Sequence, residues 1–182
     1  MGSSLYSPAL IAAADGAIAK VKARGGTVSF DPNIRPELLA DAQARAAFEL
    51  FLSRCDVLLP SETELLALAE PETEAEAIDR LLARGISNIV VKRGSRGASY
   101  CDANGTVHSS AFVVDEVDPT GAGDCFDATY LVAAQQGLGI EERLRYANAA
   151  GARAVTAKGP MEGVSTWAEL RAFLAKAKSP EA

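Results

Sequence analysis

The residues best suited to chemistry in this sequence lie in one short stretch, residues 118–127, which reads DPTGAGDCFD. An Asp-Pro turn is followed by two glycines, Gly121 and Gly123, and then by Asp124, where an apolar run typical of a buried helix begins. A glycine turn that leads into a helix directs backbone N–H groups and the positive end of the helix dipole at one point. The stretch therefore predicts an anion site.

Asp124 stands beside this predicted anion site. A carboxylate there could accept a proton from a hydroxyl that attacks a bound phosphoryl group, so the combination predicts phosphoryl transfer to an alcohol. Two simpler interpretations stay open on these residues alone. Aspartate is common in the first turn of any helix because it complements the dipole, and Gly-Ala-Gly can form an ordinary tight turn.

The rest of the chain must supply the elements that position this stretch. Short buried strands alternate with amphipathic helices, a pattern that predicts βαβ units and a parallel sheet. Asn-Gly between two β-rich runs predicts an antiparallel hairpin at the edge. The expected strands are residues 27–30, 56–60, 88–92, 97–101, 106–109 and 111–117, and the expected helices are 9–24, 42–52, a helix capped by Ser61, 72–84, 126–136, 140–155 and 166–176.

The composition of the 182 residues, 48% of them hydrophobic, predicts one globular domain over residues 1–182. The net charge is −6 and no more than two basic residues are adjacent, which argues against nucleic acid as a partner. Three scattered cysteines and one histidine argue against a disulfide framework, a zinc site or a histidine triad. No apolar run reaches about 18 residues, the length that spans a membrane. We therefore expect a cytoplasmic protein.

Four loops follow the carboxyl ends of the expected strands, where ligands bind in parallel sheets: residues 31–35, 60–64, 92–97 and 118–124. Arg35 could clamp a carboxylate or phosphate, or it could form a surface salt bridge with Asp31 or Glu37. Glu64 could hold a hydrated Mg²⁺, and its spacing from Ser61 also predicts a capping box, so the two roles are compatible.

The loop at residues 92–97 reads KRGSRG. Lys92, Gly94, Ser95 and Gly97 offer side-chain and backbone donors suited to a nucleotide, although Gly-Ser-Arg-Gly is also a common turn. The sequence holds neither a P-loop motif nor the G-x-G-x-x-G fingerprint after its first strand, and it has no G-x-S-x-G elbow. These absences argue against the corresponding enzyme classes.

Residues 118–128 closely resemble the C-terminal signature of the ribokinase-like (PfkB) carbohydrate kinases. The resemblance implies that Gly121, Ala122 and Gly123 form an anion hole for the phosphoryl group and that Asp124 is the catalytic base. It also places Thr120 among the nucleotide-binding residues. The family often has Gly or Ala where Thr129 stands, a small departure.

Other loops resemble the family in the same order along the chain. Residues 31–35 look like its D-x-N-x-R loop, which implies substrate binding by Asp31, Asn33 and Arg35 and favours the 2-keto-3-deoxygluconate kinase or fructokinase branch. Residues 61–64 match its N-x-x-E segment, with Ser61 in place of the asparagine. This match implies nucleotide contact by Ser61 and water-mediated Mg²⁺ binding by Glu64. The 92–97 loop resembles its nucleotide-binding segment, and Asn148 lies in a segment resembling the helix beside the adenine.

The resemblance covers essentially the whole chain but only the C-terminal part of a family member. It implies a three-layer α/β/α fold with a mostly parallel sheet and an antiparallel edge hairpin, without the N-terminal strands, the Gly-Gly sugar motif and the β-lid. Loss of the lid would expose apolar surface, so we expect self-association into a homo-oligomer.

Three functional hypotheses follow. The first is an ATP- and Mg²⁺-dependent kinase that phosphorylates a small sugar or sugar acid, with Asp124 as base. The second is a non-catalytic, degenerate nucleotide-binding fragment of such a kinase, and the third is a phosphate-binding protein of another class. Asn148 and the 92–97 loop favour the first two over the third.

Overall fold

The computed structural model describes residues 7–34, 41–69 and 73–177. Its strands are β1 (Ser29–Phe30), β2 (Val57–Leu58), β3 (Asn88–Lys92), β4 (Ala98–Asp102) and β5 (Gly105–Ser109). They follow one another in the order β1-β2-β3-β4-β5 in one sheet, and β2 pairs in parallel with both β1 and β3. A two-residue turn joins β4 to β5, so these strands form the expected hairpin. The predicted α/β class with parallel strands and an edge hairpin is confirmed.

The helices lie close to their predicted positions. The described helices are α1 (Pro8–Lys22), α3 (Ala42–Leu52), α4 (Glu62–Ala69), α5 (Glu74–Ala83), α6 (Ala122–Gln135), α7 (Ile140–Ala154) and α8 (Trp167–Lys176), with a short 3₁₀ turn η2 (Gly94–Arg96). The largest difference is at α6, which begins four residues before the predicted start at residue 126. In the part of the chain that is described, no helix has both the length and the apolar character needed to cross a bilayer.

The strand predicted at residues 111–117 is wrong, because this segment is irregular. Its last residue, Val117, bonds to the end of α7 rather than to a strand. The N–H groups of Val117 and Asp118 both donate to the carbonyl of Val155, at the end of α7, at 2.8 and 3.1 Å. The side chain of Asn148 occupies the carbonyl of Ser109, where β5 ends. An apolar run with β-branched residues can thus be irregular, although its composition favours a strand.

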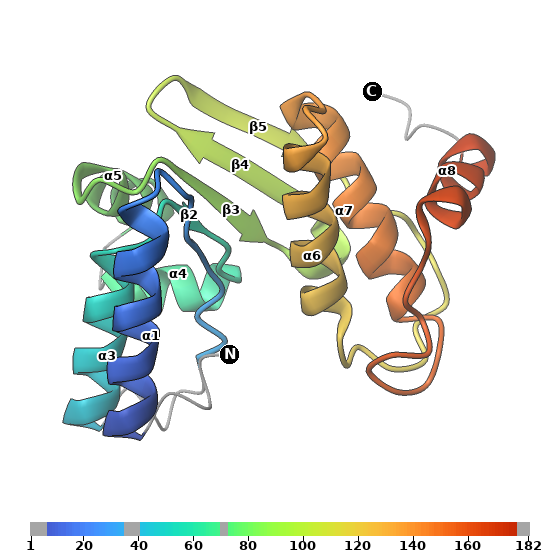
Figure 1. Cartoon of the computed structure of the whole chain (residues 1–182). Helices are drawn as coiled ribbons and strands as arrows, with labels where there is room; N and C mark the ends of the chain where they lie inside the picture. The colour runs from blue at the N-terminus through green and yellow to red at the C-terminus, as the bar shows by residue number, and fades with distance from the viewer. Residues whose placement is uncertain (1–6, 35–40, 70–72, 178–182) are drawn as a thin grey trace. The chain divides into compact units, whose positions relative to one another are not determined.

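The chain forms two compact units, Met1–Val91 with Cys101–Gly105, and Lys92–Tyr100 with Thr106–Ala182. In the first unit, α1 and α3 lie side by side (Figure 1). Phe30 of β1 packs against Phe48 and Phe51 of α3, with ring centroids 6.4 and 5.6 Å apart. These rings and the strand residues Leu58 and Ile89 belong to one buried core.

In the second unit, α6 packs along α7 (Figure 1). Leu170 and Leu174 of α8 are buried with alanines of α7 in a separate core. Aromatic pairs surround it, including Phe112 with Phe173 at 5.2 Å between ring centroids. The second unit carries all the residues that line the cavity described next. The single domain predicted over residues 1–182 stays a prediction.

Candidate functional site

The turn before α6 is held in one shape by a glycine and a carboxylate. Gly121 has φ +83°, and a Cβ at this position would lie 2.4 Å from the carbonyl oxygen of Pro160. The carboxylate of Asp118 accepts hydrogen bonds from the N–H groups of Thr120 and Gly159, both at 2.9 Å. Hydrogen bonds from the Thr120 side chain and from these two N–H groups lower the pKa of Asp118. The turn is therefore fixed before any ligand arrives.

The first turn of α6 leaves donors open. The N–H of Ala122 donates to Pro119 at 3.2 Å, and that of Cys125 donates to Gly121 at 2.9 Å. Within the described residues, no hydrogen bond uses the N–H groups of Gly123 and Asp124. Since α6 starts at Ala122, these are two of the donors that a helix start leaves unsatisfied. They and the helix dipole favour an anion at this point.

The loop at residues 92–97 is a second tight backbone feature. It contains η2, and the N–H of Arg93 donates to the carbonyl of Gly97 at 2.8 Å. Gly97 has φ +94°, and a Cβ there would lie 2.0 Å from the carbonyl oxygen of Ser109. The absence of a side chain lets this loop lie directly against the end of β5.

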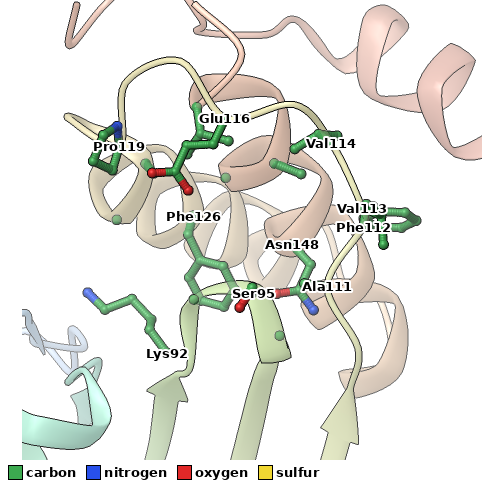
Figure 2. Close-up of a pocket in the computed structure, with 17 residues that line it drawn as sticks. Lys92, Ser95, Ala111, Phe112, Val113, Val114, Glu116, Pro119, Phe126 and Asn148 are labelled. Atoms are coloured by element: carbon green, nitrogen blue, oxygen red, sulfur yellow. The ribbon is translucent and has the colours of Figure 1, made fainter.

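The two glycine loops open onto one cavity of about 340 Å³. Figure 2 shows Lys92 towards one end, with Glu116 and Pro119 above it, and Phe112 and Val113 towards the opposite end. The cavity gathers seven of the predicted site residues: Lys92, Gly94, Ser95, Gly97, Ala122, Gly123 and Asn148. It combines an apolar end with an end that carries a cation, glycines and a helix start.

Lys92 and Asp127 form an ion pair at the charged end. Lys92 Nζ lies 2.9 Å from Asp127 Oδ2, and the side chains are only 15% and 11% exposed. Lys92 is the last residue of β3, and Asp127 is on α6, three residues after Asp124. Lys92 was predicted from sequence, whereas Asp127 was not.

Asn148 was predicted to lie near a nucleotide base, and it does line the cavity. Its Nδ2 donates to the carbonyls of Ser109 and Ser110 at 2.9 and 3.3 Å and lies 3.2 Å from Ser109 Oγ. These bonds tie α7 to the segment that leaves β5. The amide nitrogen of Asn148 therefore holds the cavity wall.

Asp124 lies on a different side of the α6 start. It is exposed at the third position of α6, and no hydrogen bond or ion pair joins its carboxylate to another residue in the described ranges. It lines a second hollow of about 430 Å³, together with Cys125, Met161 and Trp167. Burial, and then the charge of Asp124, raise the pKa of the half-buried Cys125 thiol. Asp124 thus borders a separate opening from the glycine-lined cavity.

Glu64 lies in the first unit, and both oxygens of its carboxylate accept hydrogen bonds. Its Oε1 accepts from the N–H of Ile34 at 2.7 Å, and its Oε2 accepts from the N–H and the hydroxyl of Ser61 at 2.7 and 2.8 Å. The N–H of Glu64 in turn donates to Ser61 Oγ at 3.3 Å, so the predicted capping box is confirmed. Glu64 also joins the 31–34 loop to the start of α4.

The remaining substrate-binding predictions lie in that same loop. The N–H of Asn33 donates to Asp31 Oδ1 at 3.2 Å, and Asn33 has φ +43°. Arg35 lies outside the described residues. Thr120 and Gly121 shape the turn before α6, but neither lines the cavity.

Part of the cavity lining is not among the residues predicted from the sequence. Phe112, Val113 and Val114 form a wall where a strand was expected, and Glu116, Pro119, Phe126, Gly151 and Val155 also line it. The sequence does not distinguish this wall from a strand, because an apolar β-branched run is typical of a buried strand. Asp127 did give one, as a single acid inside the apolar run that follows Asp124.

The chain is similar to known carbohydrate kinases. Residues 2–167 match the pfkB family carbohydrate kinase. The chain is 32% identical over 165 residues to a Vibrio alginolyticus fructokinase, covering 87% of this chain and 54% of the relative. It is 33% identical over 153 residues to the Bacillus subtilis 2-dehydro-3-deoxygluconokinase, covering 82% of this chain and 47% of that protein. The chain thus spans about half the length of the curated relatives it matches.

A solved structure gives the same assignment. A candidate ribokinase II from Escherichia coli, in complex with ATP and Mg²⁺, superposes with a TM-score of 0.93 and 46% identity, covering 96% of this chain and 57% of that one. A Vibrio cholerae fructokinase bound to fructose, ADP and calcium superposes with a TM-score of 0.78 and 34% identity, covering 87% and 54%. The ribokinase-like fold agrees with the family match, and the chain belongs to the pfkB family of carbohydrate kinases.

Proposed function

We propose that this chain supplies the ATP site and the catalytic base of a kinase that transfers the γ-phosphoryl group of ATP to a hydroxyl of a sugar or sugar acid. The observation that carries the proposal is the cavity that gathers Lys92, the glycine loop after β3 and the start of α6. This chain spans about half of its relatives, so the complete reaction is a proposal that the test below examines on the chain itself.

The cavity fits a nucleotide. Its volume of about 340 Å³ is within the range of small-molecule sites, and its apolar end, with Phe112 and Val113, suits a planar base. Its other end offers the Lys92 ammonium and the open N–H of Gly123, which suit phosphate oxygens. Bound ATP would supply the transferable phosphoryl group.

Asp124 suits the role of base. Its carboxylate is exposed and borders the second hollow rather than the cavity proposed for the nucleotide. An acceptor hydroxyl entering from the Asp124 side would meet a phosphoryl group held from the other side of the α6 start. The carboxylate would take the hydroxyl proton, while the N–H groups of Gly123 and Asp124 would stabilise negative charge on the phosphoryl oxygens.

Glu64 is the residue we propose for Mg²⁺. Mg²⁺ usually keeps several waters and binds through one or two carboxylates together with phosphate oxygens. Among the described residues, Ile34 alone donates to Glu64 Oε1, and a carboxylate oxygen can accept two hydrogen bonds. A contact with the ion through water is therefore compatible with the capping role of Glu64.

The acceptor class is proposed from the relatives and from the 31–35 loop. The relatives include a fructokinase, a 2-dehydro-3-deoxygluconokinase and a 5-dehydro-2-deoxygluconokinase. The first name refers to a ketose, and the other two refer to keto-sugar acids. Asp31, Asn33 and Arg35 would bind acceptor hydroxyl and carboxylate groups, which suits such compounds.

The test is a coupled ADP-release assay on this chain with a panel of ketoses, keto-sugar acids and ribose. We expect acceptor-dependent ADP release from the wild-type chain, and a loss of about 100-fold or more in kcat for Asp124→Asn. ADP affinity should stay unchanged in that variant. The matched control is Asp115→Asn, since Asp115 is also exposed but lines neither hollow.

Two outcomes would contradict the kinase proposal. If the wild-type chain binds ADP but transfers no phosphoryl group to any acceptor, the second hypothesis, a non-catalytic nucleotide-binding fragment, is favoured. If Asp124→Asn retains full transfer, Asp124 is not the base.

A further inference from the structure

Lys92 and Asp127 form an ion pair that is nearly buried. The proposed roles of the α6 donors and of Asp124 do not account for the presence of Asp127. The two charged atoms are 2.9 Å apart, and both side chains are at least 85% covered. Taking two charges out of water is costly, and a buried ion pair is often no more stabilising than apolar residues of the same volume. Stability alone therefore does not explain why a charged pair, rather than an apolar pair, lies at this point.

The location of the pair suggests another use. Lys92 lines the cavity, and its Nζ lies 3.8 Å from the point where a Cβ of Gly123 would stand. The ammonium is thus beside the first turn of α6, where the N–H groups of Gly123 and Asp124 are open. Asp127 does not line the cavity, so its carboxylate contacts the ammonium from behind.

We propose that Asp127 is a positioning residue that holds the Lys92 ammonium against the start of α6, where Lys92 contacts the anionic phosphate chain of a bound nucleotide. The inference rests on the proposed nucleotide site and adds a residue to it. An ammonium carries three N–H donors, so the bond to Asp127 is compatible with a bond to a phosphate oxygen. A lysine side chain has many rotamers, and fixing it in advance reduces the entropy lost on binding.

Two comparisons test this role: a ligand with phosphates against one without, and asparagine against leucine at position 127. A ligand with phosphates should depend on Lys92 and Asp127, whereas adenosine, which has none, should not. Asparagine at position 127 keeps the size of the side chain and an oxygen that can accept from the ammonium, but leucine keeps only the size. The asparagine variant should therefore hold Lys92 better than the leucine variant.

The experiment is calorimetric titration of the full chain with ADP and, separately, with adenosine. Lys92→Met should weaken ADP binding about tenfold, the effect of losing one charge-assisted bond. Asp127→Leu should weaken it about fivefold and Asp127→Asn less than about threefold. In the Lys92→Met background, neither substitution at position 127 should weaken ADP binding further, because Asp127 acts only through Lys92. Adenosine affinity should be the same in all variants.

Two controls keep the result interpretable. Lys176→Met removes an exposed lysine of α8 in the same unit and should leave ADP affinity unchanged. The double variant Lys92→Met/Asp127→Leu replaces the buried pair by apolar residues and should unfold at the same denaturant concentration as the wild-type chain or a higher one.

Each failure has its own reading. If Lys92→Met leaves ADP affinity unchanged, the inference about Asp127 is wrong, but the proposed nucleotide site is not affected. The same holds if the substitutions at position 127 have equal effects with and without Lys92. A wild-type chain that binds no ADP would overturn the proposed nucleotide site, and the inference with it.

Discussion

The start of α6 and the start of α4, which carries Glu64, use their polar groups in opposite ways. At α6, the N–H groups of Gly123 and Asp124 and the Asp124 carboxylate take part in no hydrogen bond within the described residues. The Glu64 carboxylate, in contrast, accepts hydrogen bonds from Ile34 and from both donors of Ser61. One region leaves its groups open to a ligand, whereas the other uses a carboxylate to join two segments of its own unit.

The difference shows how a binding site is kept open. At the start of α6, the groups left open for a ligand do not hold the turn that carries them, so other atoms must do so. Asp118 and Gly121 fix the turn before α6, and Gly97 fixes the loop after β3. Substitutions in these supporting positions should therefore alter binding as strongly as substitutions of the contact residues themselves.

The largest effect is expected at Gly97. A Cβ there would lie 2.0 Å from Ser109 O and would be held at φ +94°, so Gly97→Ala should destabilise the chain by more than about 3 kcal/mol. Chemical denaturation measures this change, and ADP titration should show that binding is lost. Gly94→Ala is the matched control, because a Cβ at Gly94 meets nothing within 4 Å. It should cost only about 1 kcal/mol.

If Gly97→Ala and Gly94→Ala cost the same, the close approach of the 92–97 loop to β5 does not shape the cavity. That result would remove the distinction between supporting residues and contact residues in this loop.

A smaller effect is expected at Glu64. Glu64→Gln removes one acceptor oxygen and the charge, so the free energy of unfolding should fall by about 1–2 kcal/mol. If Glu64 also holds Mg²⁺ through water, ADP affinity without Mg²⁺ should stay unchanged, while the gain in affinity on adding Mg²⁺ should disappear. Titrations with ADP in EDTA and in excess Mg²⁺ separate the two roles. A full Mg²⁺ effect in the variant would leave Glu64 with its capping role alone.

Much of the fold followed from local patterns. The strand at Asn88–Lys92 and the helix at Ala42–Leu52 have the predicted bounds, because an apolar run between turn signals and an amphipathic period are both local signals. The predicted strand at 111–117 is wrong, and its last residue, Val117, bonds to Val155, which is distant in sequence. Local pattern cannot show such bonds.

The site divides in the same way. The glycine loops and Lys92 were found by residue type and spacing, and the structure brings them to one cavity. The pairing of Lys92 with Asp127 could not be found, since it joins a strand end and a helix 35 residues apart. Asn148 was found, but the use of its amide to hold Ser109 and Ser110 depends on the course of a loop that the sequence suggested was a strand.

The smallest effect is expected at Asp118. Its lowered pKa means that its contribution to stability is full above the ordinary value of 3.8 and is lost as the pH falls through the lower folded value. Asp118→Asn should therefore bring a small loss of stability at pH 7 and none at a pH well below 3.8. Unfolding curves of both proteins over this pH range measure the difference. A constant difference at all pH values would show that the carboxylate charge does not fix the turn.

The most direct measurement of the central claim is a titration of the ¹⁵N-labelled chain with ADP, followed by amide NMR. We expect the amide signals of residues 94–97 and 122–124 to shift together and to saturate with one affinity. Adenosine should shift the signals of the apolar wall but not those of Gly123 and Asp124. ADP binding that leaves the Gly123 and Asp124 signals unchanged would contradict the assignment of the α6 start as the phosphate site.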